Sequence, residues 1–175
     1  MTEQTFSPKE AFSKCIQVGV VVKDIERKIE ALSSIFGIGP FRLIEWPPQG
    51  NEGLEKEYHG QPGQFTCRLA FADLGTVELE LIQPVQGPSI WQDFLDTHGE
   101  GIHHIRFNVF DEKPILQHLA ANDVGVEMWG NGTRPGTAFF YLDSQEKVGF
   151  ALELMRAIPG TDGRAAQIGK VIGQE

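Results

Sequence analysis

The stretch GEGIHHIRFNV, residues 99–109, decides the fold that this sequence can adopt. Its glycines indicate a turn, and the apolar residues after them indicate a buried strand entered directly from that turn. Neighbouring side chains on a strand point to opposite faces, so we expect only one of His103 and His104 to face the interior of the sheet. The residues that meet this histidine must come from other strands, and a weak internal repeat indicates which ones.

Composition limits the number of domains and the kinds of partner that this chain can have. The chain has 175 residues, 41% of them hydrophobic and 22% charged, which is ordinary for one globular domain or two small fused modules. A formal net charge of −9 argues against nucleic acid or an anionic membrane as a general partner. Apolar runs such as 18–22 are too short to cross a bilayer, and residues 1–10 lack the apolar segment of a secretory signal. We therefore expect a cytoplasmic protein.

The first half of the chain is predicted to be a module of strand, helix and three strands over residues 15–84, after an N-terminal arm at 1–14. Asp24 is a candidate N-cap for its helix, apolar residues follow at helical spacing, and Gly37 is a natural C-terminal stop. A long polar loop, 47–63, separates the second strand from the third.

The second half repeats this order. Residues 85–101 form a linker with a short helix capped by Ser89, and 102–156 form a second module of strand, helix and three strands. Asp111 is the candidate N-cap of its helix. Residues 157–175 are predicted to be a polar C-terminal tail.

The two modules align residue by residue at their strands. Gln17 falls on His104 and Asp24 on Asp111, while Glu80 falls on Glu153. A duplicated module of this kind normally packs into one pseudo-symmetric sheet, so we predict an α+β fold with two tandem βαβββ modules.

Four matched positions are candidate metal ligands: Gln17, Glu80, His104 and Glu153. A carboxylate between apolar residues on a strand is costly to bury without a partner, although an edge strand in water would explain either glutamate alone. One imidazole, two carboxylates and one amide oxygen suit a single divalent ion, Zn, Ni, Co, Mn, Mg or Fe, with open positions for water.

These residues lie in four motifs, QVGVVVKD (17–24), VELELIQP (77–84), GIHHIRFNV (101–109) and FALEL (150–154). Together they resemble the vicinal oxygen chelate superfamily, which includes glyoxalase I, methylmalonyl-CoA epimerase and extradiol dioxygenases. The resemblance covers residues 15–156 and is strongest to the epimerase-like branch. It implies a cupped, barrel-like mixed sheet with helices outside, one metal ion and a homodimer, and its ligand positions fall on the same four residues.

The sequence also departs from these relatives. Gln17 stands where most of the epimerase-like branch has histidine, although the zinc-type glyoxalase I uses the same Gln, Glu, His, Glu set. Val21 and Glu100 occupy the positions of the arginines with which glyoxalase I binds glutathione. Gln64 occupies the position of a further catalytic glutamate of the epimerase.

The resemblance therefore implies a metal-dependent isomerase, epimerase or lyase acting on a small carbonyl or thioester compound. Glu153 or Glu80 would abstract a proton, and the ion would stabilise the enediolate. The alternatives are an iron-dependent dioxygenase and a non-catalytic small-molecule-binding protein on the same scaffold. In the glycine-rich segment 130–136, Arg134 is either a substrate-binding residue or an ordinary surface arginine.

Overall fold

The computed structural model describes residues 7–161, 164 and 169–172. The elements of the first half are α1 (Pro8–Ala11), β1 (Cys15–Val21), α2 (Ile25–Phe36), β2 (Phe41–Trp46), β3 (Lys56–Tyr58), β4 (Gln61–Pro62), β5 (Thr66–Asp73) and β6 (Glu78–Gln86). The elements of the second half are α3 (Ile90–His98), β7 (Gly101–Val109), α4 (Lys113–Ala120), β8 (Val126–Asn131), β9 (Ala138–Leu142), α5 (Gln145–Val148), β10 (Ala151–Arg156) and β11 (Lys170–Ile172).

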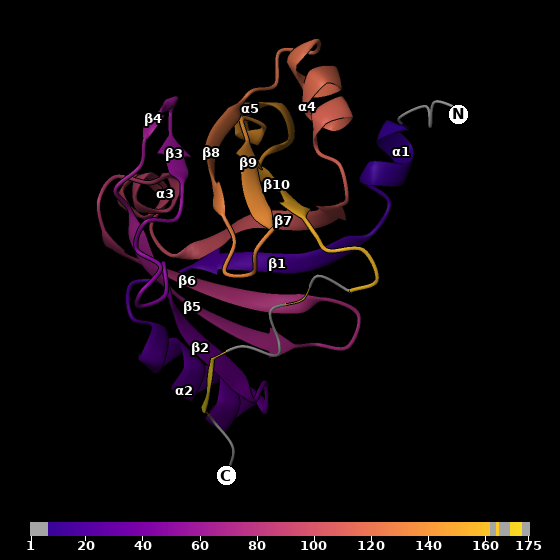
Figure 1. The fold of residues 1–175 in the computed structure, drawn as a ribbon. Helices are drawn as coiled ribbons and strands as arrows, with labels where there is room; N and C mark the ends of the chain where they lie inside the picture. The colour runs from indigo at the N-terminus through magenta and orange to yellow at the C-terminus, as the bar shows by residue number, and fades with distance from the viewer. Residues whose placement is uncertain (1–6, 162–163, 165–168, 173–175) are drawn as a thin grey trace.

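The strands form one mixed sheet in the order β11-β2-β5-β6-β1-β7-β10-β9-β8-β3-β4. Within each half, the first and last strands of the module are parallel neighbours, β1 with β6 and β7 with β10. The halves join where β1 and β7 run antiparallel, and the two arms of the sheet curl away from this seam (Figure 1). The predicted α+β fold of two βαβββ modules is confirmed.

Three apolar clusters stabilise the sheet. One lies on the inner face and combines both halves, with Trp46 and Phe65 from the first and Phe139 and Tyr141 from the second. The other two lie outside, one beneath α2 and one beneath α4. The two outer clusters hold each module together, and the shared inner cluster fixes the modules to each other.

The helix of the first module forms as predicted, whereas the start of the second differs. The Asp24 side chain accepts a hydrogen bond from the Arg27 amide (3.0 Å), and Gly37 ends α2 in the left-handed conformation at φ 68°. In α4 the N-cap residue is Glu112. The side chain of Asp111, the residue before it, accepts a hydrogen bond from the Lys113 amide (3.1 Å). The predicted cap at Asp111 is wrong by one position, because Pro114 sets the first turn of this helix.

Two segments predicted without regular structure contain strands that cover the outer edges of the sheet. The loop 47–63 contains β3 and β4, and β3 pairs with β8 of the other half. In the predicted tail 157–175, β11 pairs with β2 of the first module. Both β2 and β8 would otherwise expose unpaired backbone groups, which are a template for aggregation.

The ends of the chain are only partly described. Residues 1–6, 162–163, 165–168 and 173–175 lie outside the described residues, so the predicted arm and tail are seen in part. Within the arm, α1 brings Phe12 against Phe107, with ring centroids 5.2 Å apart in an edge-to-face contact. Across the described residues, none of the helices has the length and apolar character needed to cross a membrane.

Candidate metal centre and its pocket

Two rows of residues run across the inner face of the four central strands, β6, β1, β7 and β10. The first row is Glu80, Gly19, His104 and Ala151, and the second row is Glu78, Gln17, Arg106 and Glu153. Each member lies two residues from its counterpart in the other row, so the side chains share one face of the pleated sheet. The sequence period of two therefore brings the charged residues of both modules together.

Glu80, His104 and Glu153 form a compact buried group. Nε2 of His104 lies 3.1 Å from Oε2 of Glu153 and 3.3 Å from Oε2 of Glu80. One ligand atom from each residue lies within 4.8 Å of the others, and the side chains are at most 8% exposed. The sheet brings together the three charged residues predicted to be ligands.

The predicted fourth ligand, Gln17, is buried in the second row. Its Nε2 donates a hydrogen bond to Oε1 of Glu78 (2.7 Å), and the same Glu78 oxygen lies 3.6 Å from Nη2 of Arg106. The amide is thus held from one side by a buried carboxylate. Glu78 was not predicted as a site residue, although it lies two residues from Glu80, on the same face of the strand.

A glycine makes room for His104. Gly19 is the direct neighbour of His104 across the β1–β7 seam, and a Cβ atom at Gly19 would lie 1.8 Å from Cε1 of the imidazole. Since real side chains do not approach this closely, the ring can lie over β1 only because residue 19 has no side chain.

The two adjacent histidines both point inward, which corrects the predicted alternation. The register pairs Gly19 with His104 and Val20 with Ile102, so His103 is the extra residue of a β-bulge. The bulge leaves Ile102 65% exposed and buries both imidazoles, with Nδ1 of His103 3.1 Å from Nδ1 of His104. A metal-binding histidine is commonly oriented by a hydrogen bond to its other ring nitrogen, and His103 is placed to provide it.

Burial and charge shift the pKa values of these residues. Burial alone would lower the pKa of His104, but the Glu153 and Glu80 carboxylates raise it to about 9. Burial raises the pKa of Glu80, against the opposing effect of His104. Burial, assisted by His104, lowers the pKa of His103 well below its usual value, which keeps this imidazole neutral.

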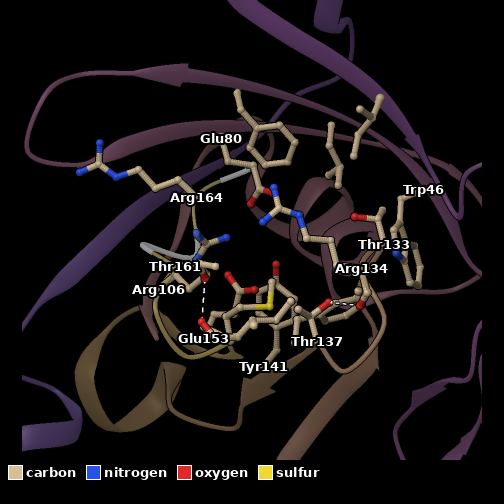
Figure 2. A pocket seen from close by; sticks show the side chains of 18 of the residues that line it. Trp46, Glu80, Arg106, Thr133, Arg134, Thr137, Tyr141, Glu153, Thr161 and Arg164 are labelled. Atoms are coloured by element: carbon tan, nitrogen blue, oxygen red, sulfur yellow. Dashed lines mark hydrogen bonds between the residues drawn. The ribbon is translucent and has the colours of Figure 1, made fainter. Parts of the chain in front are cut away.

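The group borders a cavity of about 810 Å³ that includes space open to solvent. Glu80 and Glu153 line this cavity, and Figure 2 shows Glu80 at the upper side of the view and Glu153 at the lower side, near Tyr141. The walls are mainly apolar and aromatic: Ile44, Trp46, Leu69, Phe71, Trp91, Phe139, Tyr141, Met155 and Ile158. The arrangement offers two carboxylates to a small molecule in a largely apolar chamber.

Other residues singled out from the sequence lie elsewhere. Gln64 is exposed and is not among the described residues that line the cavity. Glu100 pairs with Lys28 (2.8 Å) on the surface. By contrast Ala157, Ile158, Thr161 and Arg164, within the predicted tail, line the cavity, which composition alone did not indicate.

The donor atoms fit a divalent metal ion. Each of the four predicted ligands is among the described residues with a buried side-chain atom that lacks a hydrogen-bond partner: Oε1 of Gln17, Oε2 of Glu80, Nε2 of His104 and Oε2 of Glu153. Ligand atoms about 2.0–2.2 Å from one ion are about 2.8–3.6 Å apart, and the contacts of His104 with Glu80 and Glu153 fall in this range. Buried polar atoms without partners are rare, and a divalent cation held by Glu80, His104 and Glu153 would pair with the atoms of these three residues.

Comparison with known proteins gives a relative for part of the chain. An uncharacterized protein of Bacillus subtilis, YqjC, is 33% identical over 89 residues, a match that covers 49% of this chain and 62% of that protein. The chain thus matches less than two thirds of this relative's length.

Solved structures share the fold at low identity. A hypothetical protein from Bacillus halodurans C-125 superposes with a TM-score of 0.63 at 21% identity, covering 85% of this chain and 96% of that one. Methylmalonyl-CoA epimerase from Mycobacterium tuberculosis gives 0.61 at 18% identity, covering 89% and 95%. A Streptomyces coelicolor methylmalonyl-CoA epimerase variant in complex with 2-nitronate-propionyl-CoA gives 0.59 at 20% identity, covering 81% and 95%.

The family itself is assigned by sequence. The family model matches residues 16–142, which is most of the chain and includes Gln17, Glu80 and His104 of the candidate centre. The chain belongs to the Glyoxalase/Bleomycin resistance protein/Dioxygenase superfamily.

Proposed function

We propose that the chain is a divalent-metal-dependent enzyme that isomerises, epimerises or cleaves a small carbonyl or thioester compound. Glu80, His104 and Glu153 hold the ion, and Oε1 of Gln17 completes the protein ligands. The proposal is carried by one observation. Each of the four positions matched in the internal repeat holds a buried atom that has no hydrogen-bond partner among the described residues.

The chain's own residues supply the proton transfer. Glu80 and Glu153 both line the cavity, so a bound substrate meets a carboxylate that can take a proton from the carbon next to its carbonyl group. A bound divalent ion would supply the Lewis acidity that stabilises an enediolate.

Two alternatives remain distinct from this proposal. Iron dioxygenases use two histidines and one carboxylate, whereas this centre has one imidazole and two carboxylates. A non-catalytic binder is favoured by one observation: Nε2 of His104 lies 3.1 Å and 3.3 Å from the two carboxylates, so a protonated imidazole offsets one of their two charges without a metal.

Proton exchange tests the proposed chemistry before the product is known. The metal-loaded protein is incubated in D₂O with enolisable carbonyl compounds and thioesters, methylmalonyl-CoA included, and deuterium uptake at the α-carbon is followed by NMR. We expect metal-dependent exchange with at least one compound. Glu153→Gln or Glu80→Gln should lower the rate by about 10²–10⁴-fold, since removing a general base has this effect.

The control is Glu45→Gln, which alters an exposed strand carboxylate of β2 and should keep the full rate. Binding of compounds without metal and without exchange would support the binder instead. Oxygen uptake with a catechol in the iron-loaded protein would support the dioxygenase.

A further inference from the structure

We propose that Arg134 binds a carboxylate group of the substrate, so that the compound acted on is an acid as well as a carbonyl or thioester. This inference rests on the proposed function of the cavity and adds the chemical class of its substrate. It is carried by the turn that holds Arg134, by the partners of the cavity's other arginines and by the apolar walls.

The turn between β8 and β9 holds Arg134 in place. The Arg134 carbonyl accepts hydrogen bonds from the Thr137 amide (3.1 Å) and from Oγ1 of Thr137 (2.6 Å), and the Thr137 carbonyl accepts from the Gly132 amide (2.9 Å). Nε of Arg156 donates to the Gly136 carbonyl (3.0 Å), which ties the turn to β10. The turn is therefore built by backbone and neighbouring groups and does not need the Arg134 side chain.

The side chain is directed into the cavity. Figure 2 shows Arg134 extending from its turn with the guanidinium group toward the middle of the chamber that Glu80 and Glu153 line. Trp46 and Thr133 border the cavity on the same side. A guanidinium group beside apolar walls interacts more strongly with an anion than one surrounded by water.

The other two arginines of the cavity have acidic neighbours. Nη2 of Arg106 lies 3.6 Å from Glu78, and Nη1 of Arg164 donates to Asp73 (2.8 Å). Among the described residues, the guanidinium of Arg134 forms no hydrogen bond or ion pair. Arg134 is thus the cavity cation whose counter-charge is best supplied by a ligand.

A carboxylate suits this position better than a phosphate. A single planar guanidinium forms two parallel hydrogen bonds with a carboxylate and matches its one negative charge. A phosphate group carries about −1.5 to −2 charges, which is more than the single charge of one guanidinium. One unpaired arginine provides too little positive charge for it.

The test compares an acid with its neutral counterpart. The probes are the S-ethyl monothioester of malonic acid and the O-methyl ester of that compound, with dissociation constants measured by calorimetry on metal-loaded protein. We expect the wild type to bind the acid about 10- to 100-fold more tightly than the ester, and Arg134→Gln to abolish this preference. Arg134→Lys should restore part of it, and both variants should bind the ester as the wild type does.

The control is Arg27→Gln, which changes an exposed arginine of α2 and should keep the full preference. Equal affinity for acid and ester in the wild type, absence of binding, or an acid preference that survives Arg134→Gln would overturn the inference. Tighter Arg134-dependent binding of inorganic phosphate than of the acid would overturn the carboxylate assignment. Metal content, measured on the same samples, tests the proposed function separately.

Discussion

The two halves of the central sheet provide equivalent positions and fill them with different side chains. The first half places Gln17 beside Glu78 and Gly19 beside Glu80, whereas the second places His104 beside Ala151 and Arg106 beside Glu153. His104 thus has small neighbours on both sides, Gly19 and Ala151, while Gln17 has large charged ones. The duplicated strands supply the symmetry, and the side chains on them differ. As a result Nε2 of His104 has no hydrogen-bond partner among the described residues, whereas Nε2 of Gln17 donates to Glu78.

Replacing Glu78 should cause the largest loss of stability, because it removes the charged partner of Gln17 and Arg106. Glu78 is fully buried, accepts from Gln17 and neighbours Arg106. We expect Glu78→Ala to lower the free energy of unfolding by about 3–5 kcal/mol, since it removes one partner of a buried ion pair. Denaturant unfolding measures the change, and the exposed Glu45→Ala should cost less than about 0.5 kcal/mol. A loss as small as that of the control would contradict a supporting role for Glu78.

Adding a side chain at Gly19, beside His104, should prevent metal binding. A methyl group at Gly19 meets the imidazole, so Gly19→Ala should displace His104, abolish tight metal binding and cost about 1–3 kcal/mol of stability. The matched control is Gly101→Ala on β7, where a Cβ would lie 3.9 Å from Phe94, an ordinary contact. Metal titration of both variants decides the point, and unchanged affinity in Gly19→Ala would show that His104 is not a ligand.

Replacing His103 should have the smallest effect of the three. His103→Phe keeps an aromatic ring against Phe94 and Tyr141 but removes the nitrogen that contacts His104. We expect metal affinity to fall about 10- to 100-fold, as for other residues that orient a ligand. Competition with a chromophoric chelator measures the affinity, and His98→Phe on α3 is the exposed control. Equal affinity in both variants would mean that His103 only packs.

Local sequence pattern was sufficient to predict that Glu80, His104 and Glu153 lie on one face of the sheet. Glu80, His104 and Glu153 occupy matched positions in a repeat, and the period of two puts them on one face. The same rule gave the wrong direction for His103, because the bulge depends on how β7 pairs with β1 rather than on the residues of β7. Pattern alone therefore predicts which strands meet, and pairing decides which side chains turn inward.

The remaining differences come from contacts between distant parts of the chain. The segment that contains β3 is polar and glycine-rich, and it becomes a strand only because β8 offers a free edge. β11 forms in the same way against β2. The cavity wall formed by Ala157 and Thr161 also depends on where the chain returns after β10. Pairings between segments far apart in the sequence cannot be predicted from local periodicity.

The most direct test of the account is the metal content of the purified protein. Elemental mass spectrometry is applied to protein prepared without an affinity metal and then incubated with Zn, Ni, Co and Mn, beside His104→Ala and the exposed control His118→Ala. The account predicts about one divalent ion per chain in the wild type and in His118→Ala, and none in His104→Ala. Absence of a bound ion from the wild type after incubation, or retention of the ion by His104→Ala, would contradict it.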